Sequence, residues 1–229
     1  MYKIAGIVVD MNLKYPRLIR QSEAYKCEDT KPDIRINFPD GYLEERQKEN
    51  PHLSIEDCEY IWAGSEFYEL LPEFGGFLLH SSAIVYEDKA YLFSAPSGTG
   101  KSTHTQLWLK NFEGAYILND DKPAVMLKDG KIMVYGTPFS GKTDLNVNKC
   151  VPLQGLCVLE RDEKNWIEKI PTEEALFSIL NQTCRPIDEG RMDKLLTILD
   201  KIVSTVPVYK LHCNMEDEAA QVSYNGMKP

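Results

Sequence analysis

The chain has 229 residues, of which 43% are hydrophobic and 27% are charged, a composition typical of a folded soluble domain rather than a disordered tail. Its 26 Lys and Arg face 35 Asp and Glu, and the net charge of −9 excludes the basic face that duplex nucleic acid requires. No apolar run approaches the ~18 residues of a membrane span, and the start of the chain indicates a strand rather than a signal peptide.

The six cysteines form no CxxC pair and are not spaced with a histidine as a zinc site requires. Their density is also too low for a disulfide scaffold. We therefore expect free thiols in a reducing cytoplasm, at Cys27, Cys58, Cys150, Cys157, Cys184 and Cys213.

The N-terminal third is the least regular part of the sequence. A β-branched apolar stretch predicts a strand over residues 3–9, and residues 12–50 are polar and interrupted by prolines. Within them, alternation at Ile34 and Ile36 predicts one edge strand. Residues 65–71 predict a short helix that Pro72 ends.

Stronger patterns follow in the middle of the chain. Two strands are predicted over 77–86 and 89–94, joined by a tight turn at Glu87–Asp88. A helix is predicted over 101–111, and a short apolar strand follows over 115–118.

The remaining residues alternate between strand and helix patterns. We predict a hairpin of 123–127 and 131–135 around Asp129-Gly130, strands over 155–160 and 165–170, helices over 173–182 and 190–204, a strand at 206–211 and a closing helix at 215–222. These elements predict an α/β fold in a single domain, in which residues 1–76 form a β-rich elaboration and residues 77–229 form the core.

The segment APSGTGKS, residues 95–102, carries the clearest chemical signal. It follows a predicted strand and opens a predicted helix, which is the context of a phosphate-binding loop. Its glycines let successive N–H groups point at phosphate oxygens, and the helix N-terminus adds partial positive charge. The strict motif has glycine at its first position, where this chain has Ala95.

This loop predicts an ATP site with Mg²⁺. Lys101 would neutralise the β- and γ-phosphates, and the Ser102 hydroxyl would ligate the metal. The predicted nucleotide-binding residues are Ser97, Gly98, Thr99, Gly100, Lys101, Ser102 and Thr103. The alternative interpretation is a glycine-rich turn without a ligand.

Two adjacent carboxylates, Asp120 and Asp121, follow the next short strand. One can hold Mg²⁺ while the other accepts a proton from an incoming hydroxyl. A surface turn or a helix cap is the alternative interpretation of the pair.

Weaker candidates lie around these motifs. His80 stands in the strand before the loop, and residues 136–144 form a second loop rich in small side chains. From that loop Ser140, Gly141 and Lys142 are predicted to contact a substrate, as is Arg185 in the break between two helices. A structural histidine, an ordinary connection and solvated cations are the corresponding alternatives.

Taken together, His80, the SGTGKS loop, Asp120-Asp121 and the later GTPFSGK segment resemble the HPr kinase/phosphorylase superfamily. The closer resemblance is to HPr-kinase-related proteins, some of which modify peptides or small hydroxyl compounds. The loop is also similar to that of ATP-dependent phosphoenolpyruvate carboxykinase. The resemblance covers about residues 77–211 and implies a PEP-carboxykinase-like P-loop core with a mixed, largely antiparallel β-sheet flanked by helices.

The resemblance also implies roles for the site residues. Gly98, Gly100, Lys101 and Ser102 would bind the triphosphate and Mg²⁺. Asp120 would be the general acid/base, Asp121 the metal ligand, and His80 the support of the catalytic aspartate. Lys101, Asp120 and His80 are accordingly the predicted catalytic residues.

The sequence departs from HPr kinases in two ways. GTPFSGK stands where those enzymes carry a basic, glycine-rich signature for their protein substrate, and their N-terminal regulatory domain has no counterpart here. HPr itself is therefore not the expected substrate.

The predicted function is an Mg²⁺- and ATP-dependent kinase that transfers the γ-phosphoryl group to a serine-type hydroxyl of a peptide or small molecule. A non-catalytic nucleotide-binding regulatory or scaffold module is the alternative, and a carboxykinase-like lyase would need a longer chain. We expect a cytoplasmic protein that binds neither nucleic acid nor membrane, and the sequence leaves a homo-oligomer open.

Overall fold

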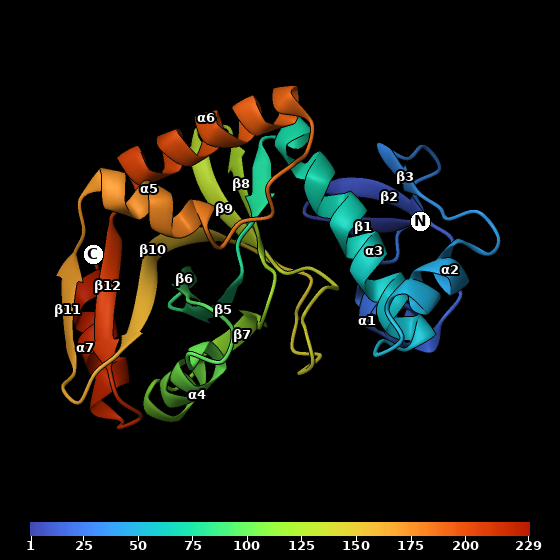
Figure 1. Cartoon of the computed structure of the whole chain (residues 1–229). Helices are drawn as coiled ribbons and strands as arrows, with labels where there is room; N and C mark the ends of the chain where they lie inside the picture. The colour runs from blue at the N-terminus through green and yellow to red at the C-terminus, as the bar shows by residue number, and fades with distance from the viewer.

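A mixed sheet of nine strands forms the centre of the protein (Figure 1). The structure is a computed structural model and describes residues 1–229. Strands run in the order β4-β8-β9-β10-β6-β5-β7, with β12 paired to β10 and β11 to β12. Their bounds are β4 Gly76–Leu78, β5 Ser81–Tyr86, β6 Lys89–Ser94, β7 Tyr116–Asn119, β8 Ala124–Lys128, β9 Lys131–Tyr135, β10 Cys150–Arg161, β11 Trp166–Lys169 and β12 Val208–Cys213.

The long strand β10 joins two parts of the sheet. Its first residues, Cys150 to Pro152, pair antiparallel with β9. Beyond an irregularity between Leu153 and Gly155 it pairs parallel with β6, and its last residues pair parallel with β12. All other pairs in this sheet are antiparallel. The mixed, largely antiparallel α/β architecture predicted from the sequence is therefore present.

Helices cover both faces of the sheet, because alternate strand residues point to opposite sides. Ala83 and Val85 pack into the cluster that includes α5 (Thr172–Leu180) and α6 (Glu189–Thr205). Ile84 packs with side chains of α4 (Lys101–Asn111) and α7 (Glu218–Met227) on the other face. Figure 1 shows α5 and α6 above the sheet and α4 below it.

Residues 1–76 are richer in helix than the sequence indicated. The predicted strand 3–9 is a hairpin of β1 (Tyr2–Ile4) and β2 (Ile7–Met11), with positive φ at both turn residues, Ala5 and Gly6. The predicted edge strand is present as β3 (Ile34–Ile36), parallel to β2. The expected β-rich elaboration also contains three helices, α1 Pro16–Ser22, α2 Tyr42–Glu49 and α3 Ile55–Leu70, with 3-10 turns at Glu23–Tyr25 and Leu71–Phe74.

Helix α3 was predicted only over its last turns. It begins at Ser54, whose side chain accepts a hydrogen bond from the Asp57 N–H while the Asp57 carboxylate accepts from the Ser54 N–H. Its buried residues include Tyr60, Phe67 and Tyr68, which contact Phe139 of the core. The N-terminal segment therefore shares one apolar cluster with β4, β8 and the loop that contains Phe139.

Local signals elsewhere are confirmed. The helix over 101–111 has the predicted bounds, and the turns at Glu87–Asp88 and Asp129–Gly130 both have two residues of positive φ. The predicted strand 77–86 is divided, because β4 pairs with β8 while β5 pairs with β6. Leu79 and His80 form the break between them.

The helices and cysteines agree with the sequence in two further respects. No helix of the chain is both long and apolar enough to cross a bilayer. All six cysteines are free thiols.

The packing of α4 against α7 makes the protein sensitive to acid. His104 is 3% exposed, its Nε2 lies 3.0 Å from the Ser223 Oγ, and burial lowers its pKa to about 3. In an unfolded chain the pKa of histidine is about 6.5. Between about pH 3 and about pH 6.5 the unfolded state therefore binds a proton that the folded state does not. We expect this group to cost about 1.4 kcal/mol of stability for each pH unit as the pH falls below about 6.5.

Urea unfolding of the His104→Gln variant between pH 7 and pH 5 tests this, since glutamine does not titrate. The variant should lose less stability over that interval than the parent protein. The control is His52→Gln, at an exposed histidine. Equal pH slopes in all three proteins would show that His104 is not the responsible group.

Candidate functional site

The segment 95–102 connects β6 to α4 as a compact loop. Gly98 and Gly100 have φ values of 79° and 126°, a backbone region that L side chains rarely adopt. Gly100 directly precedes α4, so the free N–H groups of the helix open beside the loop. The loop has the curvature and the helix terminus that an anion site uses.

Lys101 lies within this loop and is only 8% exposed. Its Nζ donates to the Ala95 carbonyl at 2.8 Å and lies 3.5 Å from the Pro96 carbonyl. Burial lowers the pKa of Lys101, and the negative charges of Asp121 and Asp120 act in the opposite direction. A buried ammonium without a direct ion pair attracts an anion.

Arg161 supports the loop from the end of β10, a role that the sequence analysis missed. Its Nε donates to the Thr99 carbonyl at 3.0 Å, and its guanidinium also donates to the Gly98 carbonyl. β10 is the parallel neighbour of β6, so its carboxyl end lies beside the loop that follows β6. Its position at the end of an apolar strand is the signal that could have identified it.

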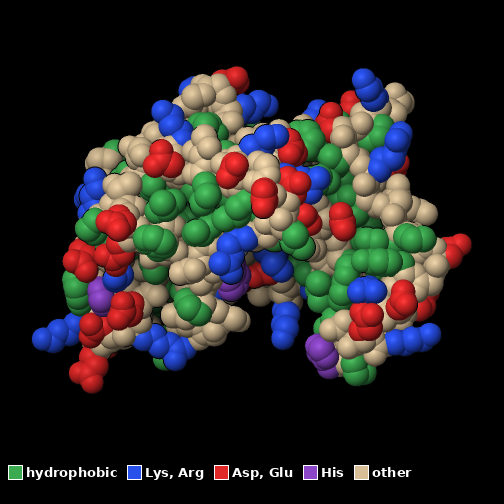
Figure 2. Space-filling view, turned by 45° about the horizontal axis from the view of Figure 1, so that its top comes forward, with side chains coloured by type: hydrophobic (Ala, Val, Ile, Leu, Met, Phe, Trp, Pro, Cys, Tyr) green, Lys and Arg blue, Asp and Glu red, His purple; other side chains and the backbone are tan.

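A cavity of about 490 Å³ lies in front of the loop. It is lined by most of the residues predicted from the sequence to form the site, and they come from four separate segments of the chain. Its lining residues are His80, Ser97, Gly98, Gly100, Lys101, Ser102, Thr103, Asp120, Asp121, Gly141, Lys142 and Thr143. Figure 2 shows the surface hollowed between the two parts of the molecule, with Lys, Arg and His side chains at the edge of the hollow.

Asp120 is tied to the helix that follows the loop. Its Oδ1 accepts a hydrogen bond from the Ser82 hydroxyl at 2.6 Å, and that hydroxyl lies 3.0 Å from the Thr105 Oγ1 of α4. The carboxylate is 7% exposed, and its Oδ2 makes no hydrogen bond within the chain. Asp120 therefore has one oxygen fixed and one available in the central cavity.

Asp121 has different neighbours. The His80 Nε2 lies 3.4 Å from its Oδ1, and the Lys122 Nζ lies 3.1 Å from its Oδ2. Burial favours the neutral acid, but the hydrogen bond from His80 and the charge of Lys122 together hold the pKa of Asp121 below its usual value. His80, expected to support Asp120, contacts Asp121 instead, and its Nδ1 lies 3.1 Å from the Gln182 Oε1.

The loop 136–144 closes over Asp121 and is held there by the N-terminal segment. The Gly141 N–H donates to the Tyr60 hydroxyl at 2.9 Å, and the Gly141 carbonyl accepts from Arg17 at 3.0 Å. A Cβ on Gly141 would lie 3.0 Å from the Asp121 Cβ. Glycine is therefore the residue that lets the loop backbone approach the carboxylate.

Two further cavities adjoin the central one. The first, about 400 Å³, shares Gly98, Gly100 and Thr103 with it and extends toward the ends of β10 and β12; its other residues are Thr99, His104, Leu107, Leu159, Glu160, Arg161, Asp162, Cys213, Asn214 and Met215. The second, about 710 Å³, shares Asp121, Gly141 and Lys142 and extends toward α1 and α3; its other residues are Arg17, Arg20, His52, Leu53, Glu56, Asp57, Tyr60, Ile61 and Asp144.

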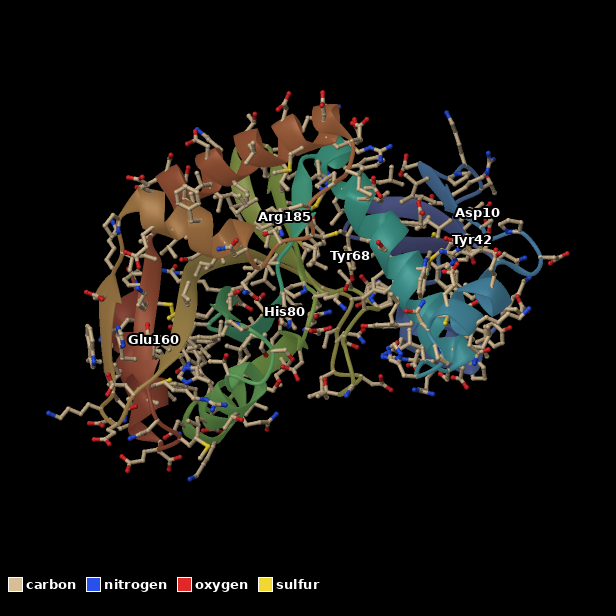
Figure 3. All side chains as sticks on the ribbon, viewed as in Figure 1. Asp10, Tyr42, Tyr68, His80, Glu160 and Arg185 are labelled. Carbon is tan, nitrogen blue, oxygen red and sulfur yellow. The ribbon has the colours of Figure 1, made fainter.

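Two predicted substrate residues lie outside these cavities. Ser140 is fully buried, and its Oγ accepts a hydrogen bond from Asn146 at 2.9 Å. Arg185 is exposed, lines none of the three cavities, and lies on the connection between α5 and α6, above His80 in Figure 3. The structure thus brings Gly141 and Lys142 to the cleft and leaves Ser140 and Arg185 away from it.

The chain contains no group of three or more His, Cys, Asp or Glu side chains that would cage a metal ion. Asp120 and Ser102 offer a carboxylate and a hydroxyl oxygen in the central cavity. Mg²⁺ is commonly held by one or two such protein oxygens together with phosphate oxygens and water. The donor set fits a Mg²⁺ ion that arrives with a phosphate ligand.

Comparison with solved structures gives a distant likeness. No family model matches the chain, and no curated protein sequence does. The HPr(Ser) kinase/phosphatase from Coxiella burnetii aligns over 65% of this chain and 95% of its own, with 11% identity and a TM-score of 0.37. A likeness this distant says nothing about the activity of this chain. The activity has to be inferred from the site itself.

The contact between Gly141 and Asp121 leads to a test of the loop's position. Gly141→Ala adds a Cβ against Asp121 at a residue with φ of +69°. We expect it to destabilise the protein by more than the about 1–2 kcal/mol that a left-handed alanine costs alone. Gly114→Ala is the control, since its φ is +83° and its Cβ would meet no atom within 4 Å.

Urea unfolding of both variants separates the two effects. A larger loss in Gly141→Ala than in Gly114→Ala is the expected result. Equal losses would mean that loop 136–144 moves away from Asp121 without cost.

Proposed function

We propose that the protein is an Mg²⁺-dependent phosphotransferase that moves the γ-phosphoryl group of ATP to a hydroxyl group. The observation that carries the proposal is the central cavity, where a glycine-rich loop with its buried lysine faces two carboxylates with different partners. A phosphate-binding loop supplies charge stabilisation, and a separate carboxylate can accept the proton of the hydroxyl.

The nucleotide would lie across two of the cavities. The about 400 Å³ cavity has apolar side chains from Leu107, Leu159 and Met215 beside polar groups, which suits a nucleoside. It joins the central cavity along the glycine-rich loop, so phosphates that follow the loop reach Lys101. In this arrangement Arg161 would stabilise the loop rather than contact the transferred group.

Asp120 and Ser102 would hold Mg²⁺ in this arrangement. When bound there, Mg²⁺ would neutralise part of the charge on the transferred phosphoryl group. The assignment rests on the free Oδ2 of Asp120 and on the Ser82–Thr105 hydrogen bonds that tie this carboxylate to α4.

Asp121 would accept the proton of the hydroxyl, which reverses the division of labour that the family resemblance implies. It borders both the central cavity and the cavity beside α1 and α3, so a hydroxyl approaching from the latter side meets it. The lowered pKa of Asp121 keeps the carboxylate ionised at neutral pH. His80 fixes one of its oxygens.

The first test is nucleotide binding. Lys101→Ala removes the buried ammonium and should weaken ATP binding by ~2–4 kcal/mol, which is ~30- to 1000-fold in affinity. Lys110→Ala is the matched control on the same helix, because its exposed ion pair with Asp217 lies outside the cavities. Calorimetric titration with ATP and Mg²⁺ measures both; unchanged affinity in Lys101→Ala would refute the phosphate-loop assignment.

The second test separates the two aspartates. Asp121→Asn should keep ATP and Mg²⁺ binding and lower turnover roughly 10²–10⁴-fold, the usual cost of a lost general base. Asp120→Asn should instead raise the Mg²⁺ concentration needed for ATP binding. Steady-state ADP production and Mg²⁺ titrations check both variants, and exchanged phenotypes would restore Asp120 as the base.

A further inference from the structure

We call the cavity beside α1 and α3 the wall cavity. In the proposed reaction, ATP occupies the other two cavities, and the wall cavity is the space left for the second substrate. It meets the central cavity at Asp121, Gly141 and Lys142. A molecule in the wall cavity can therefore place a hydroxyl beside Asp121, with the phosphate loop across the central cavity from it. In-line transfer needs the acceptor hydroxyl and the γ-phosphoryl group to face each other in this way.

The N-terminal segment builds the outer side of this cavity in a defined conformation. Arg17 is ion-paired with Asp57, its guanidinium lies 3.8 Å from the centre of the Tyr60 ring, and it donates to the Gly141 carbonyl. Tyr60 is buried and accepts from the Gly141 N–H. Both polar groups of the Gly141 peptide are thus bound by the N-terminal segment, which also sets the position of the next residue, Lys142.

The charges of the wall cavity leave one lysine unpaired. Lys142 is exposed and makes neither an ion pair nor a hydrogen bond. In contrast, every carboxylate of the cavity has a partner: Asp57 with Arg17, Asp144 with Arg20, Asp121 with His80 and Lys122, and Glu56 with the backbone N–H of Arg17. The Glu56 carboxylate keeps its charge, because its partner is a neutral N–H, and Lys142 is the cation of the lining that is free to pair with an anionic ligand.

The size of the cavity favours a small molecule. Its volume of about 710 Å³ falls within the range of ~300–1,000 Å³ typical of small-molecule sites. A protein substrate would require a surface of about 800 Å² on each partner, and four of the charged side chains that line this cavity are already paired with one another, Arg17 with Asp57 and Arg20 with Asp144.

We infer that the wall cavity is the acceptor site, and that its ligand is a compact hydroxyl compound with a carboxylate or phosphate group that pairs with Lys142. This inference rests on the proposed phosphotransfer and specifies its acceptor. Arg17 and Tyr60 are positioning residues in it, because they act on the ligand through Gly141.

The test compares acceptors that differ at their charged end. ADP production at saturating ATP and Mg²⁺ is measured with glycerol, glycerate, glycerol 3-phosphate and N-acetylserine amide. We expect glycerate or glycerol 3-phosphate to exceed both neutral compounds at least about tenfold in kcat/KM, since a charge-assisted contact is worth about 1.5–3 kcal/mol. Which of the two anions is preferred distinguishes a carboxylate from a phosphate ligand.

Lys142→Ala should remove most of this preference by raising the acceptor KM, while ATP affinity stays within about threefold of the parent protein. Lys128→Ala is the control, at a lysine on the β8–β9 hairpin that lines none of the three cavities. An undiminished preference in Lys142→Ala would overturn the assignment, as would faster reaction with the neutral serine compound.

Tyr60→Phe tests the positioning role, because it keeps the ring under Arg17 and removes the acceptor of the Gly141 N–H. It should raise the acceptor KM with little change in ATP affinity. An unchanged acceptor KM would contradict the role of the N-terminal segment.

Binding measurements separate failure of this inference from failure of the proposed function. Calorimetry with glycerate and with glycerol 3-phosphate, in the presence of saturating ADP and Mg²⁺, should show binding that Lys142→Ala weakens. Nucleotide binding without any Lys142-dependent anion binding would overturn the acceptor assignment alone. Absence of Lys101-dependent ATP binding would overturn the proposed function and the inference with it.

Discussion

The close approach of Gly141 to Asp121 is the contact on which the arrangement of the cleft depends. A Cβ at this position would lie 3.0 Å from the Asp121 Cβ, and its residue would have to adopt a φ of +69°, so a side chain here would push the loop away from the carboxylate. Arg17 and Tyr60 hold the two polar groups of the Gly141 peptide from the other side. Through this contact, residues more than eighty positions apart define the boundary between two cavities.

The sheet supplies the second constraint. Because β4 pairs with β8 while β5 pairs with β6, the strand is interrupted at Leu79 and His80. At this interruption the His80 ring reaches Asp121. The carboxyl end of β10 is brought beside the phosphate loop in the same way, since β10 runs parallel to β6. Strand pairing therefore places the imidazole and the guanidinium of Arg161 that complete the site.

The charges of the cleft reconcile an acidic chain with the proposed anion sites. The net charge of −9 belongs to the chain as a whole, while Lys101 and Lys142 line the cleft and make no ion pair. Lys101 is buried in a polar loop, where its attraction for phosphate is screened less than at an open surface. Lys142 is exposed, so its contribution depends on how a ligand fills the wall cavity.

The sequence by itself determined the features that depend on neighbours along the chain. The glycine-rich loop, the helix over 101–111 and the turn at Asp129–Gly130 follow from local backbone preferences, and all are present. Tertiary structure alone decided that His80 contacts Asp121, that Arg161 supports the loop, and that Arg17 and Tyr60 hold Gly141. The first turns of α3 escaped detection because the exposed Ile61 and the buried Glu59 obscure the apolar stripe that continues to Phe67. The contacts of His80, Arg161, Arg17 and Tyr60 join segments that are distant in the sequence, and no local pattern encodes which distant residue a side chain will contact.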